Sequence, residues 1–219
     1  GMGVEAKLLP FNSWVKGILA NSNTLSGPMI ASVYATAMGF VFGRLLTNVF
    51  YVSGRFELII TIVLIFSIVA GEAMAYASTK VKEILLFSSI AQASIVALLF
   101  VNGIIIWAVY LIIANALSKT LMFLVINKAA KDVKSDEVGK LKGLFSNNVV
   151  VGLAFTLATL SVMGLPLLVG FVVKLNFLTV PSRGQPEPKI LFRMLSCFFI
   201  WLEYRLNCFI PIILIKSNW

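Results

Sequence analysis

Three lysines lie inside runs of apolar residues, where an ammonium group is costly to place. Lys82 is in "KVKEILLFSSIAQ", Lys119 in "LSKTLMFLV" and Lys174 in "GFVVKLNFL". An ionisable residue at the centre of a bilayer costs at least about 2.5–3.5 kcal/mol, and such residues mark ion and proton pathways. Because burial disfavours the charged form of an amine, a row of lysines bridged by water can pass protons.

Each lysine taken alone also has a plainer interpretation. Lys119 can extend along its helix to the inner membrane interface, and Lys82 can be an interfacial anchor near Lys80 and Glu83. Lys174 has apolar neighbours on both sides. Since the three lysines stand on separate predicted helices, together they favour a proton relay over three independent anchors.

Polar side chains accompany two of these lysines. Asn115 precedes Lys119 by four residues, which places both on one face of a helix. Lys82 is followed by hydroxyl and amide groups that can support water between helices, from Ser88, Ser89 and Gln92. We predict that these four polar residues support the relay.

Two further features interrupt the apolar runs. Glu72, in "VAGEAMAY", is an acidic residue inside a predicted span, and it is either a counter-charge or a group near the inner headgroups. Gly164, Pro166 and Gly170 interrupt the run 149–178. Broken helices at membrane depth are tolerated where they line protein or water and often mark ion pathways. A simple proline kink gives the same pattern.

The composition restricts the class of protein. The 219 residues are 59% hydrophobic and 12% charged, with a mean hydropathy of +0.97, whereas soluble domains carry about 25% charged residues. Half the usual fraction of charged residues is too few to cover the surface of a soluble globular protein. The sequence therefore predicts an integral membrane protein in contact with the lipid bilayer.

Charge and residue types exclude several functions. The net charge is +9, but the basic residues are scattered between apolar runs and form no basic helix face, which excludes nucleic acid. The chain has no histidine, and Cys197 and Cys208 form no CxxC motif. There is also no glycine-rich phosphate loop. We therefore expect no metal, haem, iron–sulfur cluster, NADH or flavin, and no catalytic centre in this chain.

The long apolar runs predict a polytopic bundle of transmembrane helices. A spanning helix needs about 20 mainly apolar residues, and the runs show no alternation typical of a barrel strand. Asn102 and Gly103 are predicted to form a tight turn between two of them. We predict five to six spans, in which Gly164 and Pro166 break the fifth: 27–43, 56–76, 84–101, 104–126, 149–178 and 190–215.

The loop 127–148 and the N-terminal residues indicate the orientation in the membrane and the nature of the first segment. The loop 127–148 carries five lysines, so its side of the membrane is expected to be cytoplasmic, as for a multi-pass protein of a bacterial inner membrane. Residues 1–25 lack the charge and cleavage pattern of a signal peptide. They are amphipathic and suit an interfacial or broken-helix segment.

Four stretches resemble, in order, the proton-conducting membrane transporter family, which supplies antiporter-like subunits of respiratory complex I and of Mrp-type multisubunit Na⁺/H⁺ antiporters. They are "LLPFNSWVKGILANSNTLSGPMIAS", "KVKEILLFSSIAQ", "NALSKTLMFLV" and "LATLSVMGLPLLVGFVVKLNFL". The resemblance covers roughly residues 3–178 and places Lys82, Lys119 and Lys174 on lysines of the family. It implies the second half of an antiporter-like fold.

The sequence departs from the family pattern at several positions. Glu5 stands where the family has a lysine, with Lys7 two residues on, and Asn115 stands where it has a histidine. Leu167 replaces the second proline of the broken helix. The first half of the family's fold is absent, and the tail does not resemble its later helices. These departures suggest a truncated, partly degenerate copy, and a tail read out of frame is one explanation of the last feature.

The resemblance predicts three regions and a function. The regions are an amphipathic segment (1–25), an antiporter-like transmembrane domain (26–178) and an atypical apolar tail (179–219). The short motifs are most similar to the D subunit of Mrp antiporters, which implies proton translocation by a lysine and water relay in a multisubunit Na⁺/H⁺ antiporter. Alternatives are a proton-pumping subunit in the membrane arm of NADH:quinone oxidoreductase and a non-functional remnant of either. In both active cases the implied partners are other membrane subunits.

Overall fold

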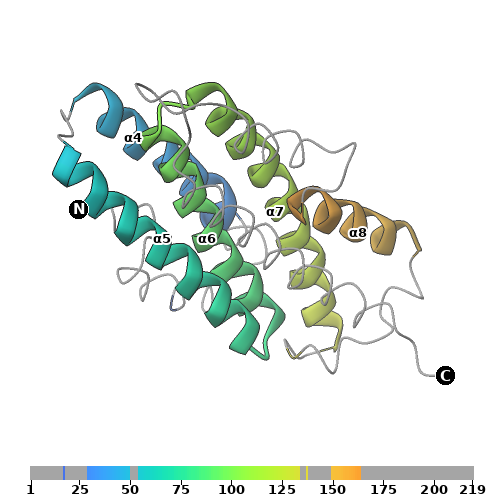
Figure 1. The fold of residues 1–219 in the computed structure, drawn as a ribbon. Coiled ribbons are helices and arrows are strands. Elements are labelled where there is room, and N and C mark those ends of the chain that lie inside the picture. Colours follow the sequence, from blue (N-terminus) through green and yellow to red (C-terminus); the bar gives the residue numbers. More distant parts are fainter. Residues whose placement is uncertain (1–16, 18–28, 50–53, 134–136, 138–148, 164–219) are drawn as a thin grey trace.

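A computed structural model describes residues 17, 29–49, 54–133, 137 and 149–163 (Figure 1). These residues are helical apart from short turns and one isolated β-bridge between Lys80 and Glu137. The helical elements are the π-helix η1 (Met29–Tyr34), α4 (Ala35–Asn48), α5 (Gly54–Ala77), α6 (Val81–Val101), α7 (Ile105–Val133) and α8 (Val149–Met163). The predicted all-α architecture is confirmed.

Three of these helices are long and apolar enough to cross a membrane: Leu58–Ala77, Val81–Val101 and Ile105–Asp132. They match the predicted spans 56–76, 84–101 and 104–126, although α7 continues about two turns further than expected. The predicted span 27–43 is observed as η1 followed by α4, and 149–178 is described only as α8. The predicted span 190–215 lies outside the described residues.

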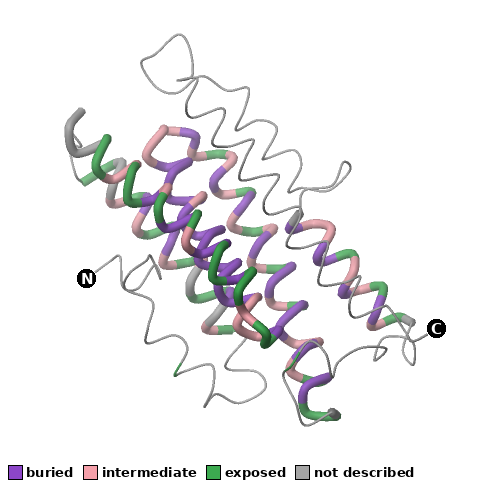
Figure 2. Tube along the Cα trace, turned by 60° about the horizontal axis from the view of Figure 1, so that its bottom comes forward, coloured by how far each residue is buried: buried purple, intermediate pink, exposed green. Residues whose placement is uncertain are grey.

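Helix α6 is the central element of the described bundle. It packs against α4, α5 and α7, while α8 packs against α7 and η1 contacts α4 and α7. Figure 1 shows α5, α6 and α7 running side by side. Figure 2 shows burial concentrated along the inner helices, and sixteen of the 21 residues of α6 are buried. Side chains on α6 therefore meet several neighbouring helices.

The turn between α6 and α7 is a tight helix C-cap, as the sequence predicts. The Gly103 N–H donates to the Phe100 carbonyl and the Ile104 N–H to the Leu99 carbonyl, both at 2.9 Å. These are the two hydrogen bonds of a Schellman motif, which requires a left-handed residue after the cap. Gly103 supplies it, with φ of 76°. The motif folds α7 back antiparallel to α6 and sets their register.

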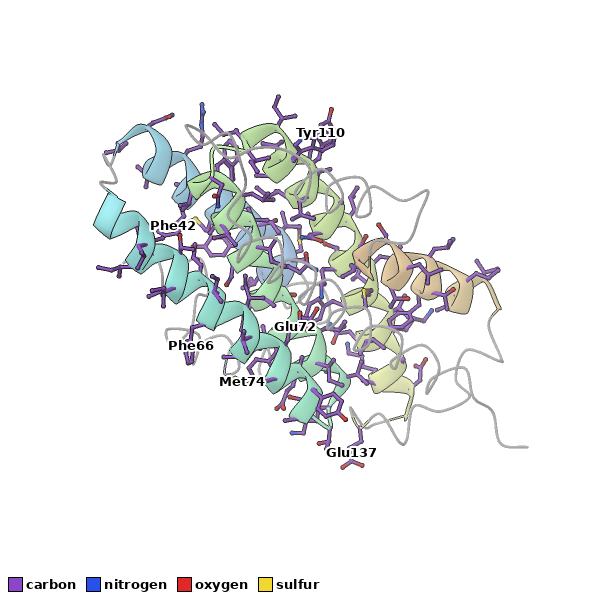
Figure 3. The ribbon with its side chains drawn as sticks, viewed as in Figure 1. Phe42, Phe66, Glu72, Met74, Tyr110 and Glu137 are labelled. Atoms are coloured by element: carbon purple, nitrogen blue, oxygen red, sulfur yellow. The ribbon has the colours of Figure 1, made fainter. Side chains whose placement is uncertain are left out.

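The outer surface of the described helices is apolar, whereas polar groups lie inside. Large apolar side chains exposed on α5 and α7 include Phe66, which is 64% exposed, and Ile106, which is 70% exposed. Figure 3 shows Phe66 pointing away from the bundle. The buried polar residues include Glu72, Ser88, Gln92, Asn115 and Lys119. This arrangement suits a bundle surrounded by lipid, since lipid tails accept apolar side chains.

Candidate functional site

Lys119 lies at the midpoint of α7, with fourteen residues of Ile105–Val133 on each side. Its side chain is 2% exposed, and its Nζ donates a hydrogen bond to the Ser88 Oγ on α6 at 2.6 Å. A lysine that reached the membrane interface would expose its end group. The described structure therefore places this amine inside the bundle rather than at an interface.

Asn115 and Gln92 form a second polar contact between the same two helices. The Asn115 Nδ2 donates to the Gln92 Oε1 at 2.7 Å, and both side chains are buried. Asn115 lies one turn before Lys119 on α7, and Gln92 lies one turn after Ser88 on α6. Because the helices are antiparallel, the two contacts form successive rungs between α6 and α7.

Apolar residues close the α6–α7 seam on both sides of these rungs. Toward the start of α6, Leu85 and Met122 belong to one buried cluster. Toward its end, Val96 and Leu111 belong to another. The polar rungs are thus enclosed within an apolar seam, where a broken hydrogen bond has no bulk water to replace it.

A small cavity lies beside the rungs. The space open to the centre of a water molecule is about 20 Å³, and one water needs about 10–15 Å³ by this measure. The Gln92 Nε2 is buried and, among the described residues, has no hydrogen-bond acceptor, so it can donate to such a water. Polar residues in the cavity wall come from η1, α4, α6 and α7: Ser32, Thr36, Ser89, Gln92, Asn115 and Lys119.

The η1 segment and the first turn of α4 add hydroxyl groups that were not among the predicted site residues. Ser32 is 2% exposed, and its Oγ is hydrogen-bonded to the Thr120 Oγ1 at 2.6 Å. The Thr36 Oγ1 donates to the Ser32 carbonyl at 2.9 Å. Short π-helices occur often at functional sites. Thr120 is adjacent to Lys119 in the sequence, and Ser32 ends the first of the four stretches that resemble the family, so both residues could have been found from the sequence.

Lys82 and Ser89 lie on α6, at different distances from the Lys119–Ser88 contact. Lys82 is the second residue of α6 and is only partly buried, so its place is compatible with a relay or with an anchor. Ser89 lies seven residues further along the same helix and lines the cavity. The Ser89 Oγ donates to the Leu85 carbonyl at 2.7 Å.

Glu72 lies within α5, and its side chain is 2% exposed. The described structure thus buries Glu72 in the bundle interior, and its role as a counter-charge stays a prediction. The remaining predicted site residues lie outside the described part of the chain: Glu5, Lys7, Gly164, Pro166, Gly170 and Lys174. Among the described residues, no three His, Cys, Asp or Glu side chains come together as a metal site would require.

Comparison with known proteins identifies the family. The sequence profile for the transmembrane part of NADH:quinone oxidoreductase and Mrp antiporter subunits matches residues 1–199. The chain belongs to this family. It is an antiporter-like integral membrane subunit, as the four motifs indicated, and the match extends beyond residue 178, where the motif resemblance ended.

One curated relative shows the extent of the sequence similarity. NAD(P)H-quinone oxidoreductase subunit 2 of Trichormus variabilis is 28% identical over 186 residues, which cover 80% of this chain and 34% of the relative. The chain therefore spans about a third of that relative's length.

Two solved structures share the fold. A protein of the archaeal membrane-bound sulfane sulfur reductase has a TM-score of 0.85 at 22% identity, covering 99% of this chain and 45% of its own length. A protein of the Mrp complex from Dietzia sp. DQ12-45-1b has a TM-score of 0.86 at 17% identity, covering 99% of this chain and 41% of its own length.

Proposed function

We propose that this chain translocates protons as a membrane subunit of a multisubunit quinone oxidoreductase of the respiratory complex I type. The observation that carries the proposal is Lys119, which is buried at the midpoint of α7 and hydrogen-bonded to Ser88. A buried ionisable residue in a membrane bundle is kept at a cost, and carrying a proton is the role that explains it.

The chemistry follows from the groups around the amine. Lys119 carries a proton as an ammonium group and becomes a neutral amine when it releases that proton. The Ser88 hydroxyl accepts a hydrogen bond from Lys119. Asn115 and Gln92 have no titratable proton near neutral pH, so their rung orients the cavity and its water rather than storing a proton. Ser89 supports the same cavity wall.

Sequence similarity favours the quinone oxidoreductase branch of the family. The curated relative from Trichormus variabilis is named a subunit of NAD(P)H-quinone oxidoreductase. The motifs of the sequence alone favoured the Mrp Na⁺/H⁺ antiporter branch, and this stays the second candidate. In either case the proposed partners are other membrane subunits, and the proposed location is a bacterial inner membrane. Lys82 and Lys174 are proposed as the flanking members of the relay.

The test is proton flux by the complete complex reconstituted in lipid vesicles with a pH-sensitive dye inside. Lys119→Ala is expected to lower flux about a hundredfold or more, because one positioned proton-transfer group typically contributes that much to a rate. Lys128→Ala is the matched control, because Lys128 lies on the same helix and is exposed. Unchanged flux in Lys119→Ala would overturn the proposal and would favour the non-functional remnant.

The driving force separates the two active branches. In the proposed branch, proton flux follows electron transfer from NADH to an added quinone and does not require sodium. If flux instead follows an imposed Na⁺ gradient without NADH, the chain works in a cation/proton antiporter.

A further inference from the structure

Glu72 and Lys119 are the two charged side chains that are buried in the described part of the chain, each 2% exposed. Glu72 belongs to the buried stripe of α5, which also contains Leu64, Ile68 and Ala75. Figure 3 shows Glu72 on the inner side of α5, whereas Phe66 and Met74 lie toward its outer side. The carboxyl group is therefore held inside the bundle by the orientation of the whole helix.

The packing of α5 on α6 sets the depth of Glu72. At Gly71, the adjacent residue, a Cβ atom would lie 3.3 Å from the Phe87 carbonyl oxygen and 3.3 Å from the Ala91 nitrogen. Glu72 is thus level with the turn of α6 that contains residues 87–91. Lys119 is hydrogen-bonded to Ser88 in that same turn. The two buried ionisable groups therefore lie at one depth, on two different neighbours of α6.

A structural role does not require an acid at this position. The α5–α6 contact already contains a neutral polar pair, in which the Ser94 Oγ donates to the Ser67 Oγ at 3.0 Å. Both serines are fully buried. A hydroxyl pair joins two helices without the desolvation cost of a carboxylate, which in practice becomes protonated or is paired with a positive charge when it is buried.

We propose that Glu72 is a further proton-carrying residue, which exchanges a proton with Lys119 around α6 through water. In the exchange, an N–H bond of the Lys119 ammonium breaks and an O–H bond forms on the Glu72 carboxylate. The products are a neutral amine and a neutral carboxylic acid, so the net charge of the bundle is unchanged. This inference rests on the proposed function, because it needs Lys119 to carry protons.

Charge substitution in the reconstituted complete complex tests the proposal. Glu72→Gln keeps the size and hydrogen-bonding capacity of the side chain but cannot carry a proton. It is expected to lower proton flux about a hundredfold or more. Glu72→Asp keeps a carboxyl group and should retain more flux than Glu72→Gln. Glu83→Gln is the matched control, because Glu83 lies in the first turn of α6 and is only partly buried.

The outcomes separate this inference from the proposed function. If Lys119→Ala abolishes flux while an assembled Glu72→Gln complex keeps the flux of the unmodified complex, the role of Glu72 is disproved and that of Lys119 stands. If Lys119→Ala has no effect, both fail. A purely structural role for Glu72 predicts that Glu72→Gln is tolerated.

A second measurement needs no substitution at all. A lipid-soluble carbodiimide takes up the proton of a protonated carboxyl group while the carboxyl oxygen bonds to its central carbon, and the adduct rearranges to a stable N-acylurea. Peptide mapping by mass spectrometry is expected to find this adduct on Glu72, with flux falling in proportion to labelling. Labelling of other carboxyl groups that abolishes flux while Glu72 stays unmodified contradicts the proposal.

Discussion

Lys119 and Ser88 face each other across two antiparallel helices, with 2.6 Å between Nζ and Oγ. The register that joins them also joins Asn115 to Gln92 one turn away. Both rungs are equally distant along the chain from the turn at Gly103 and Ile104, so a single local motif aligns the polar groups of α6 with those of α7. The geometry of the site therefore depends on that turn as well as on the polar residues themselves.

Ser88→Ala is expected to lower proton flux while the complex still assembles, because the Lys119 amine loses its hydroxyl acceptor on α6. A hydrogen bond to a charged group contributes about 1.5–3 kcal/mol, so the thermal unfolding temperature should also fall when this one is lost. Flux in vesicles and a thermal melt in detergent measure the two effects. Ser88→Thr should restore much of the flux, and Ser78→Ala, just after α5, should change neither.

Asn115 and Gln92 should be energetically coupled. In a double-mutant cycle with Asn115→Ala and Gln92→Ala, we expect an interaction energy near the membrane-protein average of about 0.6 kcal/mol, up to about 1.7 kcal/mol. Equilibrium unfolding in mixed micelles provides the four stabilities. A control cycle combines Asn115→Ala with Asn102→Ala. The Asn102 side chain donates a hydrogen bond to the Leu98 carbonyl one turn earlier, so this cycle should show no coupling.

Gly103→Ala should weaken the turn and loosen the register of both rungs. Gly103 has φ of 76°, and a side chain in the left-handed region costs roughly 1–2 kcal/mol. The melting temperature and the flux should both fall. Gly103→Asn is expected to be milder, because asparagine tolerates this conformation. Equal stability of the two variants and the unmodified protein would contradict the assigned turn.

Gly43→Ala should separate α4 from α6. A Cβ atom at Gly43 would overlap the Phe100 ring, and Phe100 also packs edge-on against Phe40 with 5.9 Å between ring centroids. Overpacking of this kind costs roughly 1–3 kcal/mol. Adding Phe100→Leu should recover part of that loss, whereas Phe100→Leu alone should destabilise. Thermal unfolding of the three variants decides whether the clash is relieved.

Much of the described fold was predictable because each spanning helix is a continuous apolar run. Residues 84–101 and 104–126 are apolar enough to be assigned without any tertiary information, and Asn102 with Gly103 is a local signal for the turn. The end of α7 was placed too early, because Asn127, Lys128 and Lys131 are polar yet remain helical. The part of the predicted span 149–178 that follows residue 163, and the whole predicted span 190–215, lie outside the described residues and stay predictions.

The sequence named several polar residues that line the cavity, but it did not predict which of them pair with each other. Ser88, Ser89 and Gln92 were assigned to Lys82, since they follow it on one helix. In the structure, Ser88 bonds to Lys119 and Gln92 to Asn115. Successive residues of a helix are rotated by about 100° and so point to different neighbours. Which neighbour each residue meets depends on how the helices pack.

The amino-acid sequence by itself determined that this is a membrane helix bundle of the antiporter-like family and that Lys119 is an unusual charge within it. Burial cost and apolar length are properties of a segment, so a sequence suffices to recognise them. The tertiary structure decided that Lys119 is inside rather than at the interface. It also added Ser32 from η1 to the cavity wall and brought Glu72 level with Lys119. Those relationships join residues on separate helices, and only the packing of α4, α5 and α7 around α6 could establish them.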